Sequence, residues 1–295
     1  MSLKPMLACD AVESRIQFPV IVQPKIDGVR MPRLLPYTTG RSLKPFGNKF
    51  TNERYSSPEL LGLDGELVYG NVTDSDLCRK TSSATSSHNG SPETMWYVFD
   101  SVQDGEYDCR LYNQRQHAAI HRIYALHDKG YTYIKYVEHV LCASMEDLLY
   151  IESKFLEQGY EGVILRDPNG KYKSGRSTVR EGGLLRIKRF VEDTATVVQL
   201  LEGETNNNEA LTNELGQTYR TSHQENKVAN GLLGSLLCET KDGKMITVSA
   251  GSMTHEERKY YLENPTVMTG SIVVYKHFPI GVKNKPRFPT FVSIK

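Results

Sequence analysis

The sequence predicts two domains, an α+β domain followed by an all-β barrel. Short runs rich in Val, Ile, Leu and Tyr occur along the whole chain, and each has the length and composition of a strand. Two helical patterns lie among these runs in the first two thirds, whereas only one short helical pattern follows residue 190. We therefore expect a first domain over residues 1–190 and a second over residues 191–295.

The first domain is expected to combine strands with two helices. The helical spacing of Ile120, Ile123, Tyr124 and His127 predicts a helix over residues 113–129. A second helix is expected to begin after its N-cap Ser144 and to stop at Gly159. Strands are expected at residues 20–23, 66–70, 95–100, 162–166 and 184–190.

The second domain shows a different pattern, with strands that follow one another closely. A single short helix interrupts them, with Thr254 as its N-cap, Glu257 at the capping-box position and Asn264-Pro265 at its end. A five-stranded barrel interrupted by one helix is the signature of the oligonucleotide-binding (OB) fold. The strands are expected at residues 194–201, 232–239, 244–250, 271–278 and 288–294.

Two polar segments are expected to be loops. Residues 73–92 are rich in serine and threonine, and residues 202–230 contain a run of asparagines. Such compositions lack the apolar residues that would bury one face of an element.

Composition and charge exclude several classes of protein. The five cysteines of the chain form no CxxC pair, which argues against a disulfide framework and a zinc site and favours a reducing cytoplasm. No apolar run approaches the roughly 20 residues that span a bilayer, so no membrane association is expected. The net charge is only +1, but residues 166–189 and 276–295 are strongly basic. These two segments favour an anionic partner.

Motifs for several common chemistries are absent. The chain has no GxxxxGK[ST] phosphate loop, no GxGxxG after a strand, no HExxH and no GxSxG. Dinucleotide redox chemistry, zinc hydrolysis and serine hydrolysis therefore have no support from the sequence.

Charged residues instead recur at the expected strand ends. A lysine before an Asp-Gly turn is common at the start of a hairpin, so the first of these segments has a simple structural explanation on its own. Strands of one sheet can bring such ends into a single groove, and lysines, arginines and carboxylates together suit a nucleoside triphosphate with magnesium. The segments are KIDGVR (25–30), DGELVYG (64–70), WYVFD (96–100), EGVILR (161–166) and RIK (186–188).

In this order, the five segments resemble the motifs of the covalent nucleotidyltransferases. RFPTFVSIK at 287–295 further resembles the C-terminal motif of ATP-dependent DNA ligases, and the likeness to the small bacteriophage-type ligases extends over nearly the whole chain. It implies an α+β nucleotidyltransferase (ATP-grasp-like) domain with an antiparallel sheet, followed by an OB-fold barrel. It also implies ATP and Mg²⁺ or another divalent cation as cofactors, and nicked duplex DNA as the partner of a monomer in the cytoplasm, the host cytoplasm if the chain is phage-encoded.

The resemblance implies a three-step reaction at Lys25. The lysine attacks the α-phosphate of ATP and holds AMP, the AMP passes to the 5′-phosphate at a nick, and the 3′-hydroxyl then expels it. The amine must be uncharged to attack, and cations such as Arg30 and Lys188 would favour that form. All three steps depend mainly on positioning and charge neutralisation.

Motif position also implies roles for the nucleotide-binding residues. Phe99 would stack on adenine, Glu66 would bind the ribose, and Gln23 would read the adenine edge. Lys188 and Arg186 would face the α-phosphate. A core aromatic for Phe99, a surface carboxylate for Glu66 and a general basic patch for the two cations are the structural alternatives.

The remaining implied roles concern the metal, the pyrophosphate and the DNA. Glu161, with help from Asp27, would hold the metal, although a structural salt bridge is the alternative for each. Arg41 would bind the nick phosphate. Further contacts are expected from Arg79 and Lys80 with the DNA backbone, and from Arg287 and Lys295 with pyrophosphate.

The sequence departs from the family at two points and leaves rival functions open. The family's KxK motif is Arg186-Ile187-Lys188 here, and the C-terminal motif stops at Lys295. An RNA ligase or a GTP-using mRNA capping guanylyltransferase would share the chemistry. A catalytically inactive DNA-binding protein is the alternative outside the enzymes, and the intact lysine and glutamates argue against it.

Overall fold

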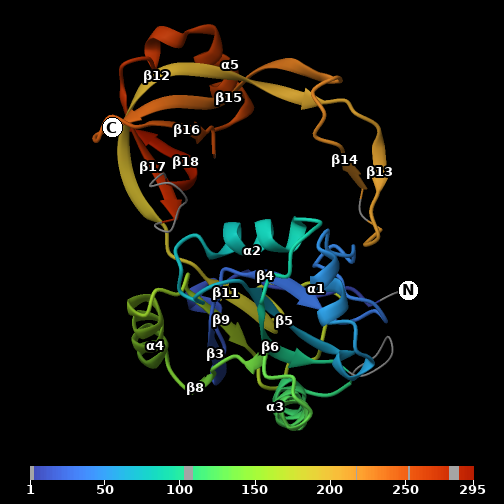
Figure 1. Ribbon diagram of the computed structural model, residues 1–295. Coiled ribbons are helices and arrows are strands. Elements are labelled where there is room, and N and C mark those ends of the chain that lie inside the picture. Colours follow the sequence, from blue (N-terminus) through green and yellow to red (C-terminus); the bar gives the residue numbers. More distant parts are fainter. Residues whose placement is uncertain (1–2, 103–108, 217, 252, 279–285) are drawn as a thin grey trace. The chain divides into compact units, whose positions relative to one another are not determined.

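The computed structural model describes residues 3–102, 109–216, 218–251, 253–278 and 286–295. The chain divides into two units, Met1–Lys188 and Arg189–Lys295, and each is described by itself (Figure 1). None of the helices in the described part of the chain combines the length and the hydropathy that a membrane-spanning helix needs.

The first unit is an α+β unit with two main sheets. Its strands are β1 (Met6–Leu7), β2 (Cys9–Asp10), β3 (Val20–Pro24), β4 (Val29–Pro32), β5 (Leu63–Val68), β6 (Met95–Ser101), β7 (Ile134–Tyr136), β8 (Val140–Cys142), β9 (Val163–Arg166), β10 (Gly175–Arg176) and β11 (Leu184–Ile187). Its helices are η1 (Glu13–Arg15), α1 (Lys49–Arg54), η2 (Pro58–Leu60), α2 (Leu77–Ser86), α3 (Tyr112–Asp128) and α4 (Met145–Glu157).

One sheet has the strand order β2-β11-β9-β3-β8 and the other the order β4-β5-β6-β7. The central pairs are antiparallel, as expected. The edge pairs β2–β11 and β6–β7 are parallel, as is the separate pair β1–β10. Helix α3 connects β6 to β7, and a crossover of this kind is what a parallel pair requires.

A helix covers each main sheet of the first unit. Ala119, Ile123 and Leu126 of α3 pack in one core with Trp96, and Leu148 and Phe155 of α4 pack in another with strands β3, β9 and β11. The N-cap prediction for α4 is confirmed, because the Ser144 side chain accepts a hydrogen bond from the Asp147 N–H. For α3 the existence of the helix is confirmed, but its expected buried face is only partly correct.

Two side chains of the expected α3 pattern, Tyr124 and His127, are exposed. Ile123 of that pattern is buried as expected and Ile120 is half-buried, and the helix buries Ala119 and Leu126 together with Ile123, at positions i, i+7 and i+4. The small Ala119 lets the helix approach the sheet, and a pattern that counts only large apolar residues overlooks it.

The prediction of a loop over residues 73–92 is wrong, because α2 forms there. Leu77, Thr81 and Thr85 lie four residues apart and are buried on one helix face. The Thr81 hydroxyl accepts a hydrogen bond from the Tyr69 N–H, and the Thr85 hydroxyl donates to the Thr81 carbonyl. Threonine is buried here with its polar atom satisfied, which composition does not reveal.

The second unit is a closed barrel with the strand order β12-β15-β16-β18-β17. Its elements are β12 (Val191–Asn206), β13 (Ala210–Thr212), β14 (Thr218–Arg220), β15 (Lys227–Thr240), β16 (Met245–Ser249), α5 (His255–Glu263), η3 (Pro265–Val267), β17 (Ile272–Phe278) and β18 (Arg287–Ile294). The capping box of α5 joins Thr254 and Glu257 as expected. Five closed strands and one helix confirm the predicted OB fold.

The expected loop over residues 202–230 is also wrong. Strands β12 and β15 stay paired out to Asn206 and Lys227, and β13 pairs with β14 beyond them (Figure 1). This extension has few apolar residues because ladder hydrogen bonds, and not a buried face, hold the two strands together.

Candidate active site

Lys25 lies in the short connection between the two main sheets of the first unit. Its N–H donates to the Gly162 carbonyl at 2.8 Å, and its own carbonyl accepts from the Glu161 N–H at 3.2 Å. These bonds continue the β3–β9 ladder by one residue. The hairpin interpretation of this segment is therefore wrong, because β3 and β4 belong to different sheets.

Two glycines of the motifs allow close approach of the backbone around Lys25. A Cβ on Gly28 would lie 2.3 Å from the Leu67 carbonyl oxygen. A Cβ on Gly162 would lie 2.2 Å from the Ile187 carbonyl oxygen, and this residue has a φ of +151°. Neither position accepts a larger residue without movement of the backbone.

Glu161 joins two lysines. Its two carboxylate oxygens accept from Lys25 Nζ and Lys188 Nζ, one each, and only 4% of its side chain is exposed. Burial alone would raise the pKa of Glu161, but the charge of Lys25 and the hydrogen bonds from both lysines outweigh it and lower the pKa. The carboxylate is thus held ionised, and Lys25 can react only after its ion pair with Glu161 opens.

Arg30 is fixed by a second buried carboxylate. Its Nε and Nη2 atoms donate to the two oxygens of Asp64, each at 2.7 Å, and Asp64 is fully buried. The guanidinium also lies 4.6 Å from the centroid of the Phe99 ring. The positive charge expected near Lys25 is therefore compensated by Asp64.

Glu66 and Gln23 each have a buried polar atom without a hydrogen-bond partner among the described residues. These atoms are Glu66 Oε2 and Gln23 Nε2. Burial raises the pKa of Glu66 to about 7, although the charges of Arg30 and Lys25 oppose the rise. Unsatisfied buried polar atoms are rare and costly. Gln23 lies on β3, directly before Lys25, and Glu66 lies on β5, which pairs with β4, the strand that follows Lys25.

The other predicted residues of the nucleotide site lie in the first unit too. Arg186 donates to both oxygens of Asp10, at 2.6 and 3.2 Å, and this contact lowers the pKa of Asp10. Asp27 follows Lys25 in the connecting segment, and its charge contributes to the raised pKa of Glu66. The structure thus brings Lys25, Lys188 and Glu161 into direct contact and places Arg30 against Phe99.

The predicted DNA-binding residues lie apart from these contacts. Arg41 is exposed in a tight turn, in which the Gly40 N–H donates to the Lys44 carbonyl and the Leu43 N–H donates to the Gly40 carbonyl. Arg79 and Lys80 lie in the first turns of α2 and form ion pairs with Asp76. Lys80 also contacts Asp74, at 3.0 Å.

Arg287 and Lys295 belong to the second unit. Arg287 begins β18, with its guanidinium 5.3 Å from the centroid of the Phe288 ring. The Lys295 N–H donates to the Ile272 carbonyl, and its side chain is exposed.

Sequence reasoning missed two carboxylates, Asp64 and Asp10, that form ion pairs with the predicted site arginines. Asp64 stands two residues before Glu66 in the same motif. The sequence therefore shows its charge, but it does not show that its partner is Arg30. Asp10 gave no signal, because its contact with Arg186 depends on the parallel pairing of β2 with β11.

Together these groups suit nucleophilic attack on a phosphate. The site offers a lysine amine, a second lysine beside it, a carboxylate that contacts both, and buried polar atoms on β3 and β5 of the two main sheets. Such a set can position a polyanion and neutralise its charge, which are the main demands of phosphoryl transfer.

Comparison with known families gives two matches. The model of the ATP-dependent DNA ligase domain matches residues 5–188, and that of the DNA ligase OB-like domain matches residues 226–295. These matches confirm the resemblance drawn from the motifs.

Similar proteins carry the same names. A DNA ligase of Haemophilus influenzae is 25% identical over 278 residues, which cover 92% of this chain and 85% of the relative. The structure of a Chlorella virus DNA ligase–adenylate is 27% identical with a TM-score of 0.56, covering 100% of this chain and 99% of that one. A DNA ligase of African swine fever virus is 25% identical over 142 residues, which cover 48% of this chain and only 32% of the viral protein. The chain thus spans about a third of that relative.

Proposed function

Because the chain belongs to the family of ATP-dependent DNA ligases, we propose that it uses ATP to seal nicks between a 5′-phosphate and a 3′-hydroxyl in duplex DNA. The observation that carries this proposal is the contact of Lys25 and Lys188 with one buried carboxylate, Glu161. A nucleophile and a phosphate-binding cation are thereby held side by side. The unpartnered atoms of Gln23 on β3 and Glu66 on β5 lie in the two main sheets that the Lys25 segment connects, and a nucleoside could satisfy them.

The proposed reaction begins at Lys25 Nζ. The amine attacks the α-phosphorus of ATP, forms an N–P bond and loses a proton, while pyrophosphate leaves. The 5′-phosphate oxygen of the nick then attacks the same phosphorus and frees the lysine. Finally the 3′-hydroxyl attacks the adenylated 5′-phosphate, so that the phosphodiester forms and AMP leaves.

Nucleoside binding is assigned to residues of β3, β5 and β6. Gln23 reads the adenine edge through its amide, Phe99 stacks on the base, and Glu66 accepts a hydrogen bond from the ribose. Arg30 supports Phe99 and binds the nucleotide, while Lys188 and Arg186 act on the α-phosphate. The ordinary strength of such bonds to charged groups is about 1.5–3 kcal/mol each.

The residues present fit a divalent cation such as Mg²⁺. Within the described residues no group of three or more His, Cys, Asp or Glu side chains could hold a metal by itself. Mg²⁺ is commonly bound by one or two carboxylates together with substrate phosphates, a role that Glu161 and Asp27 fit. The metal would neutralise charge on the phosphates.

The remaining assignments concern DNA and the division of labour between domains. Residues 1–190 form the adenylation domain and residues 191–295 the OB domain, which contributes Arg287 and Lys295 to the pyrophosphate. Arg41 binds the nick phosphate, and Arg79 and Lys80 bind the DNA backbone after exchanging Asp76 for phosphate. The protein acts as a monomer. Its scattered cysteines favour a reducing compartment, the cytoplasm.

The test is incubation with radiolabelled ATP and magnesium, followed by addition of nicked DNA. Label should become covalently attached to the protein and then disappear as sealed product forms. Lys25→Ala should show neither event. A Lys25→Ala protein that still seals nicks would refute the proposal, and label taken from GTP in place of ATP would favour a capping guanylyltransferase.

A further inference from the structure

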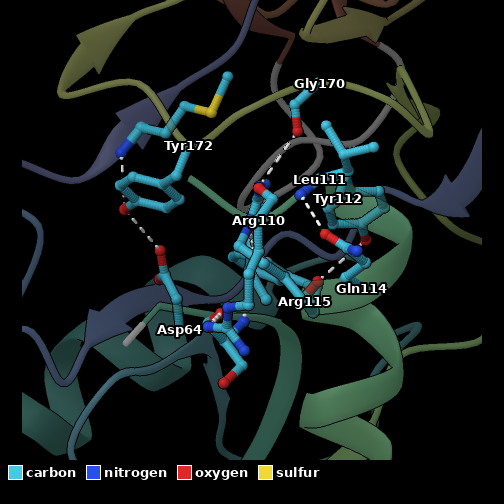
Figure 2. A network of polar contacts seen from close by, with 12 residues as sticks. Asp64, Arg110, Leu111, Tyr112, Gln114, Arg115, Gly170 and Tyr172 are labelled. Carbon is cyan, nitrogen blue, oxygen red and sulfur yellow. Dashed lines mark hydrogen bonds and ion pairs between the residues drawn. The ribbon is translucent and has the colours of Figure 1, made fainter. Parts of the chain in front are cut away.

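Tyr172 closes a ring of hydrogen bonds around Arg30. The Tyr172 hydroxyl donates to Asp64 Oδ2 at 3.2 Å and accepts from the Met6 N–H at 2.9 Å (Figure 2). Asp64 accepts from Arg30, and Arg30 Nη2 donates back to the Met6 carbonyl at 3.2 Å. Four residues that are far apart in the sequence therefore share one closed circuit.

The circuit joins the N-terminal strand to the sheet that carries Arg30. Met6 belongs to β1, which pairs with β10, while Arg30 and Asp64 lie on the paired strands β4 and β5, where Arg30 is opposite Glu66 and Asp64 is opposite Pro32. Tyr172 lies in the segment between β9 and β10. One residue of β1, Met6, is thus a partner of Tyr172 through its N–H and of Arg30 through its carbonyl.

Charge and burial fix the direction of the hydrogen bonds in this ring. Asp64 is fully buried, and a buried carboxylate must be hydrogen-bonded to remain stable. Burial and the neighbouring Asp64 raise the pKa of Tyr172 well above its usual value. The hydroxyl therefore keeps its proton and donates it to Asp64.

The position of the Arg30 guanidinium depends on both Asp64 oxygens and on the Met6 carbonyl. In the described part of the chain Nη1 makes no hydrogen bond, whereas Nε and Nη2 are both engaged. The same group lies against the Phe99 ring. A small rotation of Asp64 would therefore move both the free edge of Arg30 and its contact with Phe99.

We propose that Tyr172 is a positioning residue that sets the orientation of Arg30 for the nucleotide, and that strand β1 is thereby part of the ATP site. This inference rests on the proposed function. Tyr172 itself does not touch the reacting atoms, so its loss should weaken ATP binding and leave the rate of the chemical step nearly unchanged.

The test compares Tyr172→Phe with wild type in the formation of the labelled lysyl-AMP. The KM for ATP should rise about three- to tenfold, as expected for the loss of one hydrogen bond, with kcat within about twofold of wild type. Tyr55→Phe is the matched control, because it also removes a buried hydroxyl, one that is bonded to Thr94. It should leave the KM for ATP unchanged.

A second variant breaks the ring at another point. Met6→Pro removes the N–H that donates to Tyr172, and Met6→Leu keeps it. Met6→Pro should raise the KM for ATP in the same way, and the double variant with Tyr172→Phe should show less than the product of the two effects, because both break one circuit.

Three results would overturn the inference. An unchanged KM for ATP in Tyr172→Phe, an equal rise in Tyr55→Phe, or effects of Met6→Pro and Tyr172→Phe that multiply independently would each show that the ring has only a structural role. The wild-type measurement separates failure of this inference from failure of the proposed function. A wild-type protein that forms no lysyl-AMP overturns both.

Discussion

Replacing Glu66 with glutamine should make the first unit more stable at pH 8, although it removes a predicted ribose contact. Glu66 Oε2 is buried without a hydrogen-bond partner among the described residues, and burial raises the pKa of this carboxyl to about 7. At pH 8 the folded protein must therefore hold a charge that burial disfavours. A neutral amide of similar shape removes that charge.

The size of the gain follows from the difference between the folded and unfolded pKa. The unfolded carboxyl loses its proton near its ordinary pKa of 4.5 and the folded one near 7. Between these values the folded state binds more protons, so the stability of the wild type falls as the pH rises through this window and is constant above it. At about 1.4 kcal/mol per pH unit, the window from 4.5 to 7 gives the glutamine variant a gain of about 3–3.5 kcal/mol at pH 8 and almost nothing near pH 4.5.

Urea unfolding followed by tryptophan fluorescence can measure this gain in the full chain. The protein has one tryptophan, Trp96, which is buried in the first unit, so its signal reports that unit. Glu181→Gln is the control, because a hydrogen bond from Lys173 lowers the pKa of Glu181 and its replacement should not stabilise the protein. No gain for Glu66→Gln at pH 8, or an equal gain at pH 5, would refute the reasoning.

Three further variants test the site from different sides. Gly28→Ala places a Cβ 2.3 Å from the Leu67 carbonyl oxygen and should cost about 1–3 kcal/mol in urea unfolding; a wild-type midpoint would contradict this. Glu161→Gln should slow lysyl-AMP formation about 100-fold or more, because a neutral amide cannot serve both lysines and a metal; labelled ATP measures the rate, and a near-normal rate would exclude the role. Arg41→Ala should raise the concentration of nicked DNA at half-maximal sealing about tenfold. An unchanged concentration in a titration with nicked DNA would show that Arg41 does not contact the nick.

The parts of the fold that the sequence predicted depend on local patterns. The cap of α4 at Ser144 and the capping box of Thr254 with Glu257 are formed by residues three apart, so neighbouring letters suffice to identify them. Strand runs rich in Val and Ile can likewise be identified from neighbouring residues. The motif glycines Gly28 and Gly162 lie where two backbone segments approach closely. The need for a residue without a Cβ at these positions does not depend on the surrounding sequence.

The parts that were mispredicted depend on distant contacts. Half of the residues of helix α2 are serine or threonine, yet the helix forms because Thr81 and Thr85 make hydrogen bonds in buried positions. The extension of β12 and β15 is polar, and pairing between residues 206 and 227 holds it. Composition suggested loops in both places because it does not show which partners tertiary structure will supply.

The same limit applies to charge. Arg186 and Asp10 are 176 positions apart, and Arg30 and Asp64 are 34 apart, so the sequence showed cations without their anions. The motif segments, which looked strongly positive in the sequence, contain several cations that are already paired with carboxylates. This pairing avoids the cost of holding unpaired charge away from water.

Two kinds of ion pair follow from these contacts, and they explain why different variants should alter different steps. Glu161 is held by two lysines that are partly exposed, at 21% for Lys25 and 12% for Lys188, so a polyanion can compete for both. Asp64 is fully buried, binds Arg30 through two bonds and accepts a third from Tyr172, so this pair should survive nucleotide binding. The exchangeable pair frees the nucleophile and should govern the rate of adenylylation, whereas the fixed pair orients Arg30 and should govern affinity for ATP. A Glu161 variant that changed only the KM for ATP, or a Tyr172 variant that changed only kcat, would show this division to be wrong.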